Sequence, residues 1–291
     1  MLTIHLSDNL PVLRTIPPGC IDLIYVDPPF NMGKVQRRVT MKDHKYQKER
    51  SREYVDEFED DYLDFLEDRI KEGRRILKPN GSIFVHLDCR EVHYVKVMLD
   101  KVFGRDHFMN EIIWAYDYGA RTKKKWPAKH DNILWYVKDP KDYQYHIEEC
   151  DRIPYLSPNR QTAERAALGK TPTDTWWNTI VPTNSKENTG YPTQKPLAIL
   201  ERIVKVHSVP GDLLMDFFAG SGSFGEAAIK NGRNCILIDS NPQALEVMEK
   251  RFQGAERKIV VNDKVSYFKA SEANIAMERP GGRKVAQTHK K

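Results

Sequence analysis

Apolar runs and polar segments alternate along this chain in a way that predicts strands and helices following one another. Continuous apolar runs predict buried strands, and apolar positions at helical spacing predict amphipathic helices. The expected strands cover residues 21–26, 82–88, 111–116, 132–137, 213–217 and 234–239. The expected helices cover residues 59–77, 90–102, 196–207, 223–231 and 242–252, and a turn at 78–81 ends the first of them. Such alternation favours an α/β fold, a mostly parallel sheet with helices on both faces.

Two regions depart from this alternation of strands and helices. Residues 139–190 hold several prolines, the pair Trp176-Trp177 and little periodicity, so we interpret them as an insertion. Residues 278–291 lack apolar content and contain Pro280-Gly281-Gly282, which predicts a disordered basic tail. We therefore expect one domain over residues 1–277 that carries the insertion.

Composition narrows the class of protein. A hydrophobic content of 40% suits a globular chain. The N-terminus lacks a basic segment followed by an apolar stretch, and no apolar run approaches the roughly 20 residues of a membrane helix. The four cysteines are widely spaced, which favours reduced thiols in a cytoplasm and argues against a metal site. We expect a cytoplasmic protein with no metal and no membrane association.

Basic residues are concentrated although the net charge is only +5. Residues 31–52 hold eight Lys or Arg against two acids, and residues 117–130 hold five against one. The tail is basic as well, so the remaining chain is acidic. Such segments fit a polyanionic partner, with ordinary solvated surface as the alternative. The candidate contacts are Arg37, Arg38, Arg121, Lys123, Lys124 and Lys125.

A glycine-rich segment follows the strand expected at 213–217. Gly220, Gly222 and Gly225 satisfy G-x-G-x-x-G, and glycine permits the close approach of backbone to a ligand. Asp239 ends the next strand, where a carboxylate can accept hydrogen bonds from ribose hydroxyls. The pattern fits a dinucleotide or another adenosine-containing cofactor. Its structural alternative is glycine packing, with Asp239 capping the helix after Asn241.

Asp216 separates the cofactor classes by charge. It stands where a dinucleotide would bring its pyrophosphate, and a carboxylate is unfavourable beside phosphate. The same carboxylate is favourable beside an ammonium group. S-adenosylmethionine carries an ammonium and a sulfonium and no phosphate, so the charge favours it over NAD.

The segment Asp27-Pro28-Pro29-Phe30 directly follows another expected strand. Its two prolines fix φ and lack N–H donors, so the carbonyls form a rigid acceptor surface. Asp27 adds a carboxylate and Phe30 an aromatic face. The combination suits a flat ring that bears an amino group. A proline-rich turn with a core phenylalanine is the alternative.

Together the two loops resemble those of the DNA amino-methyltransferases, which make N6-methyladenine or N4-methylcytosine. The early Asp-Pro-Pro-Phe loop and late glycine-rich loop look like the circularly permuted β group. Four further segments are similar to that family, and the resemblance covers most of residues 1–255: LSDNLPVL (6–13), KPNGSIFVHLD (78–88), HDNILWYVK (130–138) and GYPTQKPLAILERIV (190–204).

The resemblance implies a Rossmann-like methyltransferase fold and a role for each matching residue. Residues that hold a flipped base are Asp27, Pro28, Pro29 and Phe30. Residues that line S-adenosylmethionine are Asp216, Phe217, Ala219, Gly220, Ser221 and Gly222, with Asp239 and Asn241 at the ribose, Asp8 at the adenine edge, and Thr193 and Lys195 at the carboxylate. Asp239 departs from the Glu of many relatives, and Phe218 departs from a common Pro.

The resemblance also implies the substrate-binding regions. The insertion 139–190 and a mobile basic loop at 31–56 would recognise the target in double-stranded DNA. Trp176 and Trp177 are candidates to stack on bases or wedge between them, with a small hydrophobic core of the insertion as the alternative. The resemblance implies a protein of bacterial or phage type that is associated with the nucleoid in use. The sequence leaves open a homodimer and a cognate restriction endonuclease.

We expect direct in-line methyl transfer without a covalent enzyme–base adduct. Asp27 and the Pro28 carbonyl would bind the amine and aim its lone pair at the sulfonium methyl group. The leading acid favours adenine N6, and cytosine N4 is the alternative. Three rivals remain: an NAD-dependent oxidoreductase, a non-catalytic nucleic-acid-binding module, and an RNA or protein-glutamine methyltransferase with an Asn-Pro-Pro-Tyr-like loop.

Overall fold

A computed structural model describes residues 1–30, 34–38, 52–56, 61–117 and 121–269. Most of the basic loop expected at 31–56 and the whole tail expected at 278–291 lie outside the described residues. Among the described helices, none is both long enough and apolar enough to cross a membrane.

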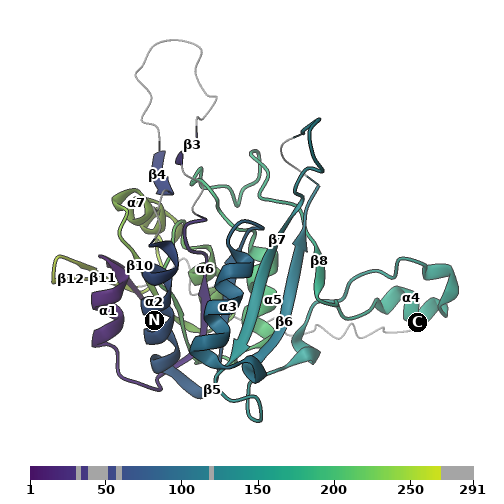
Figure 1. Cartoon of the computed structure of the whole chain (residues 1–291), viewed down its shortest axis with the longest axis horizontal. Coiled ribbons are helices and arrows are strands. Elements are labelled where there is room, and N and C mark those ends of the chain that lie inside the picture. The colour runs from purple at the N-terminus through teal and green to yellow at the C-terminus, as the bar shows by residue number, and fades with distance from the viewer. Residues whose placement is uncertain (31–33, 39–51, 57–60, 118–120, 270–291) are drawn as a thin grey trace, which may run out of the picture.

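A ten-stranded sheet forms the centre of the protein (Figure 1), in the order β12-β11-β1-β10-β9-β2-β5-β7-β6-β8. Neighbouring strands pair in parallel except for β7 and β12, which run antiparallel to their neighbours. The strands are β1 (Leu2–Leu6), β2 (Ile21–Val26), β5 (Leu77–Leu87), β6 (Phe108–Ala115), β7 (His130–Val137), β8 (Thr175–Trp177), β9 (Leu213–Asp216), β10 (Asn234–Asp239), β11 (Arg257–Val261) and β12 (Lys264–Phe268). A separate antiparallel pair joins β3 (Lys34–Arg38) and β4 (Arg52–Asp56).

Helices cover both faces of the sheet. The helices on the faces are α1 (Asn9–Thr15), α2 (Tyr62–Ile76), α3 (Val92–Phe103), α5 (Leu197–Val206), α6 (Ser223–Lys230) and α7 (Pro242–Arg251), and the short helix α4 (Ala163–Leu168) lies apart from them. Apolar residues of α1, α2 and α3 pack on one face in one core cluster, and those of α5, α6 and α7 pack on the other face in a second cluster. The prediction of a mostly parallel sheet with helices on both faces is therefore confirmed.

The order in which successive strands are added to the sheet reverses between β2 and β9, which are neighbours in the sheet. From β2 the chain passes through α2 to β5 on one side, and from β9 it passes through α6 to β10 on the other. Ligands of open α/β sheets bind at such a switch point, outside the carboxyl ends of the strands. Asp27 and Asp216 stand at these two adjacent carboxyl ends.

Periodicity located the central elements well and the peripheral ones poorly. Strand 21–26 has the expected limits, and the expected core helices shift by a few residues. The turn expected at 78–81 is wrong, because β5 runs through it with a shift in register against β2. The ion pair between Lys78 Nζ and Asp22 Oδ1, at 2.7 Å, ties this irregular stretch to the sheet. Strands β1, β8, β11 and β12 were not expected.

The region 139–190 contains regular structure in the described part of the chain. It forms α4, β8 and two short 3-10 helices, Ile147–Glu149 and Pro158–Arg160, and Figure 1 shows α4 projecting beyond the edge of the sheet. Strand β8 extends the sheet beside β6, so Trp176 is buried in the main core rather than in a separate one. Trp177 is 77% exposed.

Candidate active site

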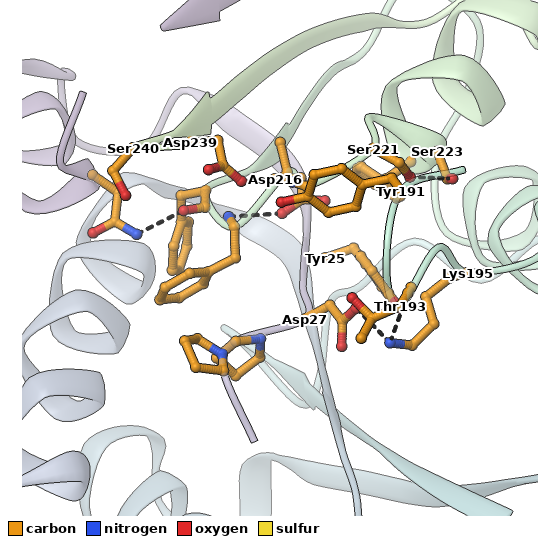
Figure 2. A pocket seen from close by; sticks show the side chains of 18 of the residues that line it. Tyr25, Asp27, Tyr191, Thr193, Lys195, Asp216, Ser221, Ser223, Asp239 and Ser240 are labelled. Carbon is orange, nitrogen blue, oxygen red and sulfur yellow. Dashed lines mark hydrogen bonds and ion pairs between the residues drawn. The ribbon is translucent and has the colours of Figure 1, made fainter. Parts of the chain in front are cut away.

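Both predicted loops line one cavity of about 490 Å³ at the switch point (Figure 2). This volume lies within the range typical of small-molecule sites. The sequence-predicted residues that line it are Asp8, Asp27, Pro28, Pro29, Phe30, Thr193, Lys195, Asp216, Phe217, Ala219, Gly220, Ser221 and Asp239. The two loops therefore share one site, although they lie far apart in the sequence.

The segment Asp27-Pro28-Pro29-Phe30, which we call the Asp27 loop, directly follows β2. Its two prolines are buried, and the side chains of Asp27 and Phe30 are partly exposed and line the cavity. Asp27 Oδ2 lies 2.5 Å from Lys195 Nζ, while Asp27 Oδ1 is buried and has no hydrogen-bond partner among the described residues. The Lys195 ammonium also lies 5.0 Å from the centroid of the Phe30 ring. The loop thus presents one unused carboxylate oxygen next to an aromatic face.

The glycine-rich loop is held by Asp239 of the next strand. Asp239 Oδ2 accepts a hydrogen bond from Gly220 N at 2.7 Å, and Oδ1 accepts one from Asn241 N at 2.8 Å. Gly220 has a φ of +50°, and a Cβ there would lie 3.2 Å from the Tyr191 ring. A side chain at residue 220 would therefore both strain the loop and fill the cavity.

Asp216 is almost fully buried beneath this loop, and Phe218 N donates a hydrogen bond to its Oδ1 at 2.9 Å. Burial raises the pKa of Asp216 well above its usual range, and the charges of Asp27 and Asp239 raise it further. Asp216 has no ion pair with any described residue. A buried carboxyl of this kind gains most from a ligand that brings a positive charge.

Lys195 and Thr193 come from the segment before α5 and lie beside Asp27 in Figure 2. The resemblance assigned both to the cofactor carboxylate, but the Lys195 ammonium is paired with Asp27 instead, and it also donates to Thr193 O at 3.4 Å. Thr193 has a φ of +60°, which is strained for a β-branched residue. Strain of this kind tends to be kept at functional sites.

Asp8 lines the cavity together with residues of α2. Its Oδ1 accepts from Leu10 N at 3.1 Å, at the start of α1, and from Arg69 at 3.0 Å. Arg69 also donates to Asn9 Oδ1 and stacks its guanidinium 3.6 Å from the Phe65 ring centroid. Arg69 and Phe65, both from α2, therefore line the cavity beside Asp8.

A buried chain of polar groups supports the Asp27 loop from the neighbouring strands. The Tyr25 hydroxyl lies 2.7 Å from His86 Nδ1, and His86 Nε2 lies 3.1 Å from Asp131 Oδ2. Tyr116 donates to the other oxygen of Asp131 at 3.0 Å. Burial alone would raise the pKa of Asp131, but its contacts with His86, Lys195 and Tyr116 hold it below its usual value.

Two predicted cofactor residues do not line the cavity. Gly222 precedes α6 as its N-cap with a φ of +75°, and a Cβ there would lie 2.8 Å from Met248 Cγ, so its small size serves packing. The Asn241 side chain caps α7 by accepting from Gln243 N. Cavity residues that the sequence analysis missed are Asn9, Tyr25, Phe65, Arg69, Tyr191, Gln194, Leu200, Phe218, Ser223, Phe224 and Ser240. Of these, Tyr191 and Gln194 could have been found from their place beside Thr193 and Lys195.

The predicted basic contacts divide between two places. Arg121, Lys123, Lys124 and Lys125 are exposed on the loop between β6 and β7. Because β7 runs antiparallel to both β5 and β6, this loop leaves the sheet at the same edge as the Asp27 loop. Trp126 follows the lysines and is 94% exposed. Arg37 and Arg38 lie in β3.

A comparison with protein families decides the class of this site. The family model described as DNA methylase, for N6 and N4 methyltransferases, matches residues 21–250. The chain belongs to this DNA methylase family. Membership confirms the prediction of an N6-adenine or N4-cytosine DNA methyltransferase, and the enzyme's two motif loops fall within the matched range. The circular permutation of the β group stays a prediction.

Curated relatives match most of the enzyme. The Type II methyltransferase M.HpaI of Haemophilus parainfluenzae is 29% identical over 84% of this chain and 72% of its own length. The DNA adenine methyltransferase YhdJ of Escherichia coli K12 is 29% identical over 96% of this chain and 89% of its own length.

Solved structures share the fold. The structure of an M1.HpyAVI–SAM complex matches with a TM-score of 0.59 and 21% identity, covering 87% of this chain and 100% of that one. The cytosine-N4-specific PvuII DNA methyltransferase matches with a TM-score of 0.62 and 19% identity, covering 86% of each chain. These likenesses confirm the predicted methyltransferase fold.

Proposed function

We propose that the enzyme transfers a methyl group from S-adenosylmethionine to the N6 amine of an adenine flipped out of double-stranded DNA. The observation that carries this proposal is the shared cavity, in which the Asp27 loop and the glycine-rich loop meet. An amine bound at the first loop is thereby brought to a methyl donor bound at the second. Positioning of this kind supplies much of the rate enhancement in group transfer.

The cavity fits S-adenosylmethionine, which supplies an electrophilic methyl group. Asp216 would hold the ammonium, because this buried carboxyl forms no ion pair with a described residue and its pKa is raised despite the charge of Lys195. Asp239 would accept from the ribose with the lone pairs that its two backbone donors leave free. Gly220 leaves room beside Tyr191. A relative in fold carries this cofactor in its structure, the M1.HpyAVI–SAM complex.

The residues of the Asp27 loop bind and orient the amine. Asp27 Oδ1 accepts one amine proton and the Pro28 carbonyl accepts the other, while Phe30 stacks on the base. These contacts draw the nitrogen lone pair out of conjugation with the ring and direct it at the methyl carbon. The new bond forms from nitrogen to carbon as the sulfur–carbon bond breaks, and the nitrogen then releases one proton to water.

The edge of the sheet that carries the cavity also carries the proposed DNA contacts. Lys123, Lys124 and Lys125 supply positive charge for phosphates, and exposed Trp126 supplies a face on which a base can stack. Arg37 and Arg38 would add contacts from the β3–β4 side. The region 139–190, which extends the sheet past β6, would contribute to target recognition.

Adenine is proposed over cytosine on two grounds. An acid leads the Asp27 loop, and the relative YhdJ, which matches 96% of this chain, is named a DNA adenine methyltransferase. We place the reaction in the cytoplasm of a bacterial cell, where chromosomal DNA lies. A homodimer, a cognate restriction endonuclease and the permuted β-group order remain proposals on the resemblance alone.

Nucleoside analysis tests the function directly. The purified enzyme is incubated with unmethylated DNA and isotope-labelled cofactor, the DNA is digested, and both methylated nucleosides are quantified by mass spectrometry. Labelled N6-methyladenine is the expected product, and the Asp27→Ala variant is the control. Labelled N4-methylcytosine as the main product would overturn the base assignment, and unlabelled DNA would overturn the function.

A further inference from the structure

The ion pair between Lys195 and Asp27 joins two motifs that are 168 residues apart. Lys195 Nζ lies 2.5 Å from Asp27 Oδ2, and the two side chains are only 8% and 16% exposed. Lys195 is held in turn by Thr193 O, at 3.4 Å, on backbone that is strained at Thr193. A partly buried pair with a short separation restricts both side chains far more than an exposed pair does.

The two oxygens of the Asp27 carboxylate have different surroundings. Oδ2 accepts from Lys195, whereas Oδ1 is buried and receives no hydrogen bond from the described residues. A buried polar atom without a partner is costly, so an atom of this kind calls for an explanation such as a ligand that binds to it. The lysine thus occupies one oxygen, while the other is left without a partner among the described residues, in a residue that lines the cavity.

The negative charges nearby explain why a cation is needed at this point. Asp27 and Asp216 stand on adjacent strands and repel each other, and Asp131 lies on the far side of His86. Lys195 acts favourably on both Asp216 and Asp131 through its charge. Without it, nothing among the described residues would hold Asp27 Oδ2, and the carboxylate could turn away from its negative neighbours.

We infer that Lys195 is a positioning residue for methyl transfer, whose ammonium holds Asp27 Oδ2 so that Asp27 Oδ1 faces the target amine. This role differs from the one expected from the resemblance, in which Lys195 binds the cofactor carboxylate. The inference rests on the proposed function, because the amine that Oδ1 accepts from belongs to the DNA base.

The test compares Lys195→Met with Lys195→Arg, alone and in an Asp27→Asn background. The measurements are kcat and KM for DNA under saturating cofactor, and the cofactor Kd by calorimetry. We expect Lys195→Met to lower kcat by about 100-fold, the typical cost of misplacing a reacting group by about 1 Å. The cofactor Kd and the KM should stay within a few-fold, because neither ligand is bound by the lysine.

The two other variants separate positioning from a structural role. Lys195→Arg keeps a cation at Asp27 Oδ2 and should recover at least about ten-fold of the kcat that Lys195→Met removes. In the Asp27→Asn background, Lys195→Met should cost little more, because residues that act as a unit are strongly non-additive. Lys205→Met, which removes a partly exposed lysine from α5, is the matched control and should leave kcat unchanged.

Two results would overturn the inference. One is a cofactor Kd weakened about ten-fold or more by Lys195→Met with kcat preserved, which would assign the lysine to the cofactor. The other is an equal loss of kcat with and without the Asp27 carboxylate. If Lys195→Met does not fold, kcat and the cofactor Kd are measured instead for Lys195→Gln and Lys195→Arg, and the same outcomes decide whether the lysine positions Asp27. Inactive wild-type enzyme in this assay would instead contradict the proposed function.

Discussion

The Asp27 loop and the glycine-rich loop are built alike and differ in how their acids are balanced. Each follows the carboxyl end of a buried strand, and each carries an aspartate into the same cavity. Asp27 is paired directly with Lys195, whereas Asp216 forms no ion pair with a described residue, is influenced by the Lys195 charge only at a distance, and has a raised pKa.

This difference follows from the chemistry of the two ligands. A base amine is neutral and brings no charge, so the counter-charge for the carboxylate that accepts from it must come from the protein itself. The cofactor brings an ammonium, so the carboxyl that binds it needs no counter-charge from the protein. An unbalanced buried charge is therefore tolerated only at the loop whose ligand balances it.

The largest expected effect comes from removing the Asp27 carboxylate. Asp27→Ala should lower the rate of methyl transfer by at least about 1000-fold, because it removes the acceptor that orients the amine. Cofactor affinity should stay within a few-fold. Calorimetry beside a turnover assay measures both, and full activity in this variant would exclude the proposed mechanism.

The opposite pattern is expected for the other loop. Asp216→Asn should weaken cofactor binding by about 1.5–3 kcal/mol, the typical contribution of a hydrogen bond to a charged group. The KM for DNA should change little. Calorimetry with the cofactor is again the measurement, and unchanged affinity would show that the ammonium is bound elsewhere.

The raised pKa of Asp216 predicts how the stability of the ligand-free enzyme depends on pH. Burial makes the folded protein hold this proton more tightly than the unfolded chain, whose aspartates have a pKa of about 3.9. Stability should therefore fall as the pH rises from about 4 through the raised folded pKa. Burial also raises the pKa of Asp239, so its ionisation should lower the stability of the folded protein over the same direction of pH change.

Urea unfolding across this pH range checks the point. Asp216→Asn should reduce the fall in the free energy of unfolding, and the exposed control Asp106→Asn should leave it unchanged. A curve that Asp216→Asn does not alter would mean that this carboxyl ionises as freely in the folded protein as in the unfolded chain.

The smallest effect is expected outside both loops. Charge reversal of Lys123, Lys124 and Lys125 should reduce the slope of DNA affinity against salt by about 1 for each phosphate that the lysines no longer neutralise. Methyl transfer at saturating DNA should persist, because neither loop is touched. Charge reversal at exposed Lys250 on α7 is the control, and an unaltered slope for the triple variant would exclude the β6–β7 loop from the DNA interface.

The sequence alone was enough to predict the central fold and to identify both loops, because these features depend on local patterns of apolar residues and short motifs. Apolar runs define β2 and β10, and the two motif loops directly follow buried strands. Edge strands such as β8 and β12 were missed because their stability comes from pairing with a neighbour rather than from an apolar run of their own. Trp176 illustrates this, since it is buried in the core cluster where β8 pairs with β6.

Tertiary structure decided which side chains meet. No local pattern relates Lys195 to Asp27, or Arg69 to Asp8, because each pair is joined only when distant segments fold onto the same edge of the sheet. The resemblance gave Lys195 a cofactor role from its motif, whereas its position beside a buried carboxylate gives it another partner. Short-range propensities act over a few residues, while the balance of buried charge depends on every element that surrounds the cavity.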